Sequence, residues 1–153
     1  MIHLKNSAQI TAMKDAGRIT GEALLVARDA VRPGVSTYEI DLAIRRYIEK
    51  CGATPTFLGY GGFPASACIS INDEVIHGIP SKSRILREGD IVKIDTGATY
   101  HGYVGDSART IPVGHVSEEA KRLMQVTRDS FWAGVEMLRP GNRLGDIGHA
   151  IDS

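Results

Sequence analysis

The sequence has few aromatic residues and no excess of charge of either sign. Aromatic side chains make up 6% of its 153 residues, and 18 basic residues are balanced by 18 acidic ones. A chain without net charge offers no general electrostatic attraction to nucleic acid or to an anionic membrane surface. We therefore expect neither nucleic acid nor a membrane among the partners of this protein.

Long hydrophobic runs and cysteine are also scarce. No apolar stretch approaches the roughly 20 residues that a membrane-spanning helix needs. The N-terminal residues MIHLKN lack the apolar centre of a signal peptide. The only two cysteines, Cys51 and Cys68, are too few for a disulfide framework in a chain of this length. These absences predict a protein of the reducing cytoplasm.

What the sequence does contain is enough apolar material for one ordinary domain, since hydrophobic residues make up 42%. Two helices are predicted in the first third. Ser7 is predicted to cap the first helix, and Arg32–Gly34 to end it. Ser36 and Glu39 form a capping-box pattern for the second helix, and Gly52 stands where a left-handed C-terminal cap is expected.

From Thr54 onward, glycine and proline punctuate short apolar segments. Ala67–Ile71 and Val75–Ile79 are predicted strands, followed by a polar loop over Pro80–Asp90. Two β-rich runs between Ile91 and Val113 then predict a hairpin. Ser117, followed by two glutamates, predicts the start of a helix that runs to about residue 138.

The predicted hairpin carries one aspartate on each strand. A turn at Tyr100-His101 would place Asp95 directly opposite Asp106, with Cβ atoms roughly 5 Å apart on one face of the sheet. Such like charges repel, and a divalent cation between them would remove the repulsion because hard metals take carboxylate oxygens. The alternative is two surface aspartates flanking a turn, which Asp favours. Aspartate is depleted inside strands, and Asp95 follows a core-like run, which argues for the metal.

Two other side chains have more than one interpretation. His77 is either a half-buried histidine bonded to backbone groups, or a substrate donor or metal ligand. Cys68 lies in an apolar segment without a neighbouring base, which favours a packed small hydrophobe over a nucleophile. The Gly59–Phe63 stretch lacks the features of a phosphate loop, and its aromatic residues are suited to line an apolar pocket.

The sequence also contains an internal repeat. Leu138–Gly141 resembles Val31–Gly34, and Pro140 stands 107 positions after Pro33. At the same offset, acidic and apolar positions of the second predicted helix recur. The first repeat covers about residues 7–114, and the second begins near 117 and stops at 153 inside its own second helix. Copies of equal length would need on the order of 100 further residues, so the sequence predicts a single, incomplete domain over 1–153.

Three motifs together resemble type I methionine aminopeptidases, over about Ser7 to Ile151. They are CISINDEVIHGIP from Cys68, GDIVKID from Gly89 and GDS from Gly105. The resemblance implies an α+β pita-bread fold with two pseudo-symmetric halves around a dinuclear metal centre. This chain would contain the first half and the start of the second.

The resemblance also implies residue roles. Asp95 and Asp106 match metal-ligating carboxylates, with Asp106 bridging both ions, and His77 matches the histidine that hydrogen-bonds the substrate near the scissile amide. The positions that match the lining of the pocket for the N-terminal methionine are Phe57, Tyr60, Phe63 and Cys68. Phe57 is a departure, because many relatives have a small residue or cysteine there.

The implied activity is removal of N-terminal methionine from new peptides by metal-assisted amide hydrolysis. The implied cofactors are two divalent ions of the Co, Mn, Fe, Zn or Ni class, and the implied partners are peptides with an N-terminal methionine. The family takes one histidine ligand, two glutamate ligands and a second substrate histidine from its second half, and this chain ends before them. No catalytic set is complete here, so we expect weak activity or none.

Two alternatives stay open at this point. One is another pita-bread peptidase such as a prolidase-like enzyme, although the stretch Ser70–Pro80 favours a methionine aminopeptidase. The other is a non-catalytic pita-bread module that serves binding or assembly. We also expect self-association through the exposed half-sheet, of which a twofold homodimer bringing four aspartates together is one form.

Overall fold

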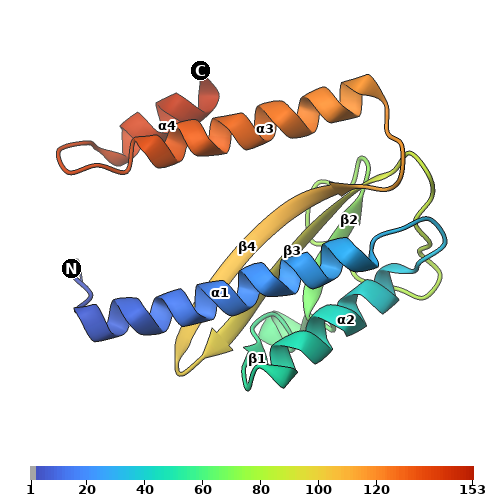
Figure 1. The fold of residues 1–153 in the computed structure, drawn as a ribbon, viewed down its shortest axis with the longest axis horizontal. Helices are drawn as coiled ribbons and strands as arrows, with labels where there is room; N and C mark the ends of the chain where they lie inside the picture. Colours follow the sequence, from blue (N-terminus) through green and yellow to red (C-terminus); the bar gives the residue numbers. More distant parts are fainter. Residues whose placement is uncertain (1–2) are drawn as a thin grey trace. The chain divides into compact units, whose positions relative to one another are not determined.

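The computed structural model describes residues 3–153, which form two compact units, residues 3–115 and Val116–Ser153. Figure 1 labels their helices and strands. The elements of the first unit are α1 (Ser7–Ala30), α2 (Thr37–Lys50), β1 (Thr54–Pro55), the short helix η1 (Tyr60–Gly62), β2 (Ala67–Ile71), β3 (Ile91–Tyr100) and β4 (Tyr103–Pro112). The second unit contains α3 (Glu118–Glu136) and α4 (Leu144–Asp152).

Helix α1 begins one residue earlier than predicted. Asn6, not Ser7, is its N-cap: the Asn6 side-chain oxygen accepts from the backbone N–H of Gln9, and the Gln9 side chain accepts from that of Asn6, both at 2.9 Å. Asn satisfies the free N–H groups of a first turn at least as well as Ser does. The helix ends at Ala30, before Pro33, as predicted.

The predicted capping box of α2 is confirmed. The Ser36 hydroxyl accepts from the Glu39 N–H at 3.2 Å, and the Glu39 carboxylate accepts from the Ser36 N–H at 2.9 Å. The Ser36 hydroxyl also donates to the Glu39 carboxylate at 2.6 Å, and this bond, followed by that from the Ser36 N–H, lowers the pKa of the Glu39 carboxyl. Gly52 has φ +73°, as the predicted left-handed cap requires.

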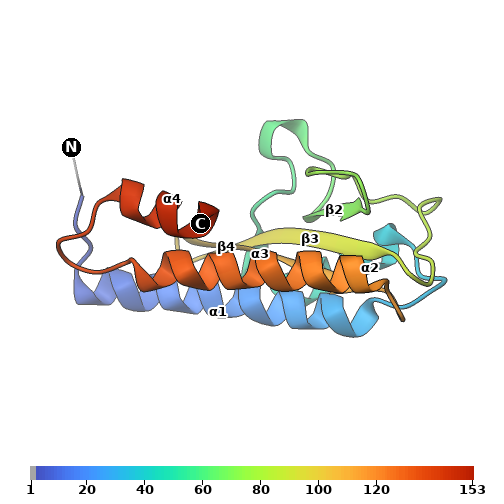
Figure 2. The same ribbon diagram turned by 90° about the horizontal axis from the view of Figure 1, so that it is seen from above.

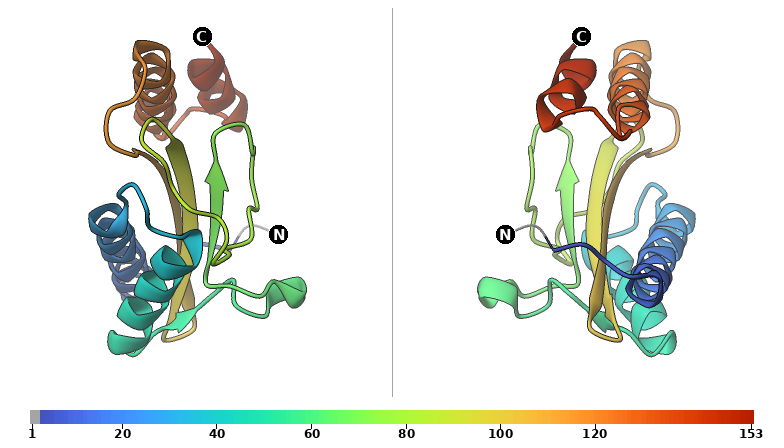
Figure 3. Two further views of the ribbon diagram at one scale, coloured as in Figure 1. Left: turned by 90° about the vertical axis from the view of Figure 1, so that its right-hand side faces the viewer. Right: turned by 90° about the vertical axis from the view of Figure 1, so that its left-hand side faces the viewer.

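The four strands form one antiparallel sheet with β3 at its centre. β4 pairs with β3 along one edge, and β2 and β1 pair with successive parts of β3 along the other. Helices α1 and α2 cover one face, and the turn with η1 lies on the opposite side (Figure 3). Helix α1 follows the length of β3 and β4 (Figure 2). The sheet and the two helices enclose a core whose largest fully buried side chains include Ile19, Ile40, Ile44, Ile48, Ile69 and Ile94.

The prediction of a strand over Val75–Ile79 was wrong. Asn72 and His77 have φ of +51° and +59°, so the segment cannot stay extended. It runs beside the outer edge of β2 as a loop (Figure 3) and meets that edge through Gly78, whose carbonyl accepts from the Ile69 N–H at 2.8 Å.

Unit Val116–Ser153 is a pair of helices. The Ser117 hydroxyl accepts from the Ala120 N–H at 3.1 Å, which confirms the predicted N-cap of α3. Gly141 in the break has φ +99°, as Gly34 in the matching break has φ +87°. The Asp146 carboxylate accepts from the Arg143 N–H at 2.6 Å, the bond that Glu39 makes at the matching position of α2. The helix–break–helix pattern therefore recurs, while the assignment of both units to one incomplete catalytic domain stays a prediction.

Among residues 3–153, no helix combines the length and the apolar content that crossing a bilayer requires.

Candidate functional site

The hairpin that carries the two aspartates has a different register from the predicted one. Tyr100 pairs with Tyr103, so the turn is His101-Gly102 rather than Tyr100-His101. Both turn residues have positive φ, +49° and +79°. Two-residue hairpins favour this conformation because its twist matches that of the strands, and glycine adopts it without strain. Gly102 was the sequence signal that could have placed the turn.

The prediction that Asp95 and Asp106 stand directly opposite each other was therefore wrong. Asp106 pairs with Gly97, and Asp95 pairs with Ala108. Because residues 95 and 97 project from the same face of β3, the two aspartates are diagonal neighbours on that face, roughly 7 Å apart between Cα atoms. The face is the same as predicted, since the register differs by an even number of residues.

The two carboxyl groups interact electrostatically. Burial raises the pKa of the Asp95 carboxyl, and the charge of Asp106 and a hydrogen bond with its side chain raise it further. The charge of His77 acts in the opposite direction, which shows that this ring is within electrostatic range of Asp95. Asp95 is half-buried whereas Asp106 is exposed. One half-buried carboxylate beside another is a place where a cation would be stabilising.

Glycines show which face of the sheet the aspartates occupy. A Cβ at Gly105 would overlap the carbonyl group of Ala16 in α1, so Gly105 faces the helices and its neighbour Asp106 faces away from them. On the aspartate face, a Cβ at Gly97 would stand 3.0 Å from Cε1 of Phe57. The Phe57 ring therefore covers the sheet directly beside both aspartates.

Cys68 completes this cluster. It lies on β2 directly opposite Asp95 and is 7% exposed. Burial, followed by the charges of Asp95, Asp106 and Asp41, raises the pKa of its thiol to about 11. Such a thiol is protonated at neutral pH and is not a nucleophile, in agreement with its interpretation as a packed small hydrophobe.

His77 is exposed rather than half-buried, which removes the interpretation as a buried histidine held by backbone groups. Its position follows from Gly78, because a Cβ at Gly78 would overlap the carbonyl of Ile69. Only glycine lets the loop approach β2 so closely. The Gly78 N–H also donates to the Ser70 hydroxyl at 3.0 Å.

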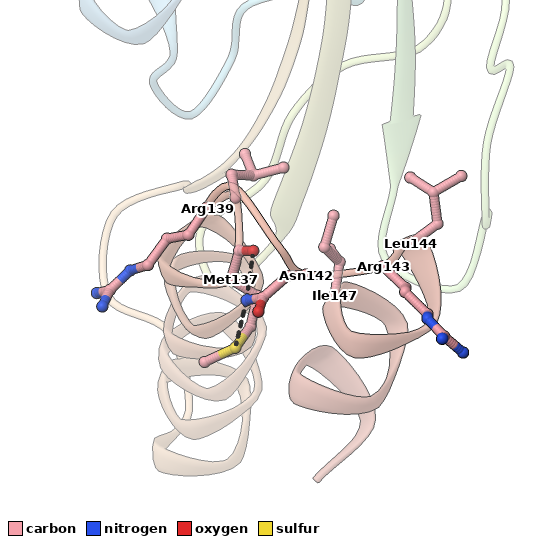
Figure 4. Close-up of a pocket in the computed structure, with 7 residues that line it drawn as sticks. Met137, Arg139, Asn142, Arg143, Leu144 and Ile147 are labelled. Carbon is pink, nitrogen blue, oxygen red and sulfur yellow. Dashed lines mark hydrogen bonds between the residues drawn. The ribbon is translucent and has the colours of Figure 1, made fainter.

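The other two predicted pocket residues do not close a cavity around Cys68. Tyr60 is 80% exposed and Phe63 half-buried, on a turn in which Gly59, Gly61 and Gly62 all have positive φ. A cavity of about 320 Å³ lies instead at the break between α3 and α4, where Asn142 donates to the Met137 carbonyl (Figure 4). The structure thus brings Phe57 and Cys68 to the aspartates and leaves Tyr60 outside an enclosed pocket.

The donor set fits a divalent cation only in part. Asp95 and Asp106 offer carboxylate oxygens on one face, which suit a hard cation. Residues 3–153 contain no group of three or more His, Cys, Asp or Glu side chains able to hold a metal ion. Two carboxylates leave most coordination positions of a divalent ion to water or to other ligands.

Sequence reasoning missed Asp41, a residue of α2 that supports the site by holding the start of β2. It is 8% exposed, and one of its oxygens accepts from the N–H groups of Ser66 and Ala67, both at 2.8 Å. Burial raises the pKa of the Asp41 carboxyl, and these two bonds act against that rise. They fix the start of β2 next to Cys68. The available signal was an acidic residue between Ile40 and Ile44, within the apolar stripe of α2.

Comparison with known proteins agrees with this geometry. The chain is 54% identical to a methionine aminopeptidase of Clostridium acetobutylicum over 151 residues, which are 99% of the chain and 60% of the relative. It is 45% identical to methionine aminopeptidase 1 of Bacillus subtilis, over 100% of the chain and 61% of the relative. The chain thus spans about 60% of the length of these relatives.

Solved structures give the same result. The methionine aminopeptidase from Rickettsia prowazekii superposes with a TM-score of 0.96 at 42% identity, covering 99% of this chain and 60% of that one. An Xaa-Pro dipeptidase from Bacillus anthracis superposes with a TM-score of 0.74 at 28% identity, covering 86% and 36%. These neighbours confirm the expected α+β pita-bread fold. The model of Metallopeptidase family M24 matches residues 11–153, and the chain belongs to that family.

Proposed function

We propose that this chain carries two metal-ligating carboxylates and part of the substrate site of a methionine aminopeptidase, an enzyme that removes N-terminal methionine from new peptides. The observation that carries the proposal is the position of Asp95 and Asp106. They lie together on the sheet face that α1 and α2 leave open, with Phe57, Cys68 and His77 around them. The identity of 54% to a methionine aminopeptidase supports this substrate over that of a prolidase-like enzyme.

In this proposal Asp95 and Asp106 would hold two ions of the Co, Mn, Fe, Zn or Ni class, and Asp106 would be a ligand of both. A divalent metal bound there would lower the pKa of a water and polarise the scissile carbonyl. Asp95 must lose its proton before it can act as a ligand, and its raised pKa makes metal binding stronger as pH rises.

The remaining residues contact the peptide. His77 donates to the peptide near the scissile amide, from a loop fixed to β2. Phe57 and the protonated Cys68 offer an apolar surface beside the carboxylates, which suits the thioether of methionine. Tyr60 and Phe63 would move toward that surface to enclose the side chain. We place this activity in the cytoplasm, where new peptides carry their initiating methionine.

The chain by itself is proposed to be weakly active or inactive. Its described residues supply these two carboxylates and no group of three or more side chains able to hold a metal ion. Self-association through the exposed half-sheet would cover the sheet face that α1 and α2 leave open (Figure 3). A twofold dimer that brings four aspartates together is the form of association that would change the metal site.

Titration with Co²⁺ or Mn²⁺ in a calorimeter, combined with hydrolysis of a Met-Ala-Ser peptide, tests the proposal. We expect weak binding to the unsubstituted chain, loss of that binding in Asp106→Ala, and no loss in Asp73→Ala, which removes an exposed turn carboxylate. Equal binding by the Asp106→Ala chain would contradict the metal site and favour a non-catalytic binding module. Fast metal-dependent turnover would refute the predicted weak activity.

A further inference from the structure

Arg84 connects three separate parts of the chain. Its guanidinium donates to the carbonyl of Ile69 at 3.1 Å and to that of Ile79 at 2.9 Å, and it forms an ion pair with the Glu74 carboxylate. The Arg84 side chain is 25% exposed, so these bonds form at a partly desolvated position. A planar guanidinium can serve several acceptors at once because its N–H groups point in fixed directions.

Two of the three acceptors lie on either side of His77. Glu74 precedes it by three residues, and Ile79 follows it by two. The third acceptor, Ile69, belongs to β2 and directly follows Cys68, which pairs with Asp95 of β3. Arg84 therefore ties both ends of the His77 loop to the strand that borders the candidate metal site.

No buried apolar side chain of the loop holds it in place. Val75, Ile76 and Ile79 are 79%, 67% and 53% exposed, so burial of apolar side chains does not fix it. His77 itself has φ +59°, a conformation that a non-glycine residue leaves readily unless its surroundings impose it. Apart from Arg84, the loop meets β2 through two hydrogen bonds of Gly78, with Ile69 and Ser70, and two of Glu74 with Ile71.

The base of the arginine is itself fixed. The Arg84 carbonyl accepts from the N–H of Thr37 at 2.9 Å, at the start of α2. Leu86, two residues later, is 1% exposed in the core. The guanidinium thus extends from a rigid part of the first unit onto a loop that lacks rigidity of its own.

We propose that Arg84 is a positioning residue that holds the Glu74–Ile79 loop so that His77 faces the substrate side of Asp95. We call the contacts of Arg84 with Ile69, Ile79 and Glu74 the clamp. The clamp needs the planar guanidinium of arginine, because a lysine ammonium cannot reach two carbonyls and a carboxylate in this arrangement. That His77 then meets a peptide rests on the proposed function, whereas the clamp itself does not.

Amide hydrogen exchange and histidine ring resonances, both measured by NMR on the full chain, test the clamp. In Arg84→Met and Arg84→Lys we expect the Ile69 and Gly78 amides to exchange at least tenfold faster, and the His77 ring resonance to move. The Ile94 amide in the core should keep its rate. Arg45→Met is the matched control, because Arg45 makes one ion pair, with Glu49 at 2.8 Å, and contacts no carbonyl of the loop.

The lysine variant separates the effect of the planar guanidinium geometry from that of the positive charge. Full protection of Ile69 and Gly78 in Arg84→Lys, or no change in Arg84→Met, would overturn the proposal. Glu74→Gln gives a second check in a chain that keeps Arg84, and faster Gly78 exchange there supports the clamp. Addition of Met-Ala-Ser peptide then tests the proposed function separately. If the His77 resonance does not shift on peptide addition, the result contradicts peptide binding at His77. The exchange rates of the Ile69 and Gly78 amides still test the clamp independently.

Discussion

Replacing Asp106 by asparagine should stabilise the metal-free chain and remove its response to metal. The exposed Asp106 carboxylate stands diagonally across the hairpin from the half-buried Asp95 and raises the pKa of the Asp95 carboxyl. Asparagine has nearly the same shape, carries no charge and can donate a hydrogen bond to the Asp95 carboxylate. The substitution therefore removes a repulsion while leaving the hairpin intact.

The size of the effect follows from the geometry. Two unit charges roughly 6 Å apart repel by about 0.7 kcal/mol in water and by about 3 kcal/mol at an effective dielectric constant near 20. Because Asp106 is exposed, the lower part of this range applies. We expect the free energy of unfolding to rise by about 1 kcal/mol at pH 7.5, or the melting temperature by about 2–4 °C.

The pH dependence has a defined sign. A carboxyl whose pKa is raised on folding binds more protons in the folded chain than in the unfolded one, so its contribution to stability falls as pH rises from about 4 through the folded pKa. The advantage of Asp106→Asn should therefore be present at neutral pH and disappear in acid, where Asp95 is protonated in both proteins.

Urea unfolding with and without Co²⁺ measures both effects. Metal at about 100 times its dissociation constant should stabilise the unsubstituted chain by about 2.7 kcal/mol and Asp106→Asn by much less. Asp73→Asn removes one negative charge from an exposed turn and should change neither quantity. A metal-free Asp106→Asn chain that is less stable than the unsubstituted protein would refute the reasoning, as would equal stabilisation of both by metal.

Three further predictions concern the surroundings of the site. Asp41→Leu leaves the Ser66 and Ala67 N–H groups without their acceptor and should cost about 2–4 kcal/mol in urea unfolding, whereas Asp41→Asn keeps that oxygen and should stay within about 1 kcal/mol. Gly105→Ala, in β4, drives a methyl group into α1 and should lower the free energy of unfolding by about 1–3 kcal/mol or more. Gly17→Ala, at a position of α1 with open space around it, should instead raise the free energy of unfolding by up to about 1 kcal/mol. Cys68, with a thiol pKa of about 11, should react with iodoacetamide at pH 8 far more slowly than Cys51, as peptide mass mapping would show; equal rates would contradict the buried, protonated thiol.

The helices and the open face of the hairpin could be predicted from sequence because their causes are local. The capping box of Ser36 and Glu39 and the break at Pro33 act within a few residues, so their pattern identifies α2 and the end of α1. Alternation along a strand has a period of two, so Asp95 and Asp106 were assigned to the same face even though the turn was misplaced. The register itself required the positive φ of His101 and Gly102, a backbone property that the apolar pattern does not carry.

Sequence patterns were thus enough to predict the family, the first two helices and the pair of aspartates on one β-hairpin. Tertiary structure alone decided that Phe57 covers Gly97 beside them, that Asp41 anchors β2, and that Arg84 ties down the loop of His77. Val75–Ile79, which has the composition of a strand, is a loop for the same reason. The partners in these contacts are separated by 5 to 40 residues. Such contacts form only when packing of α1 and α2 on the sheet has fixed where each segment lies.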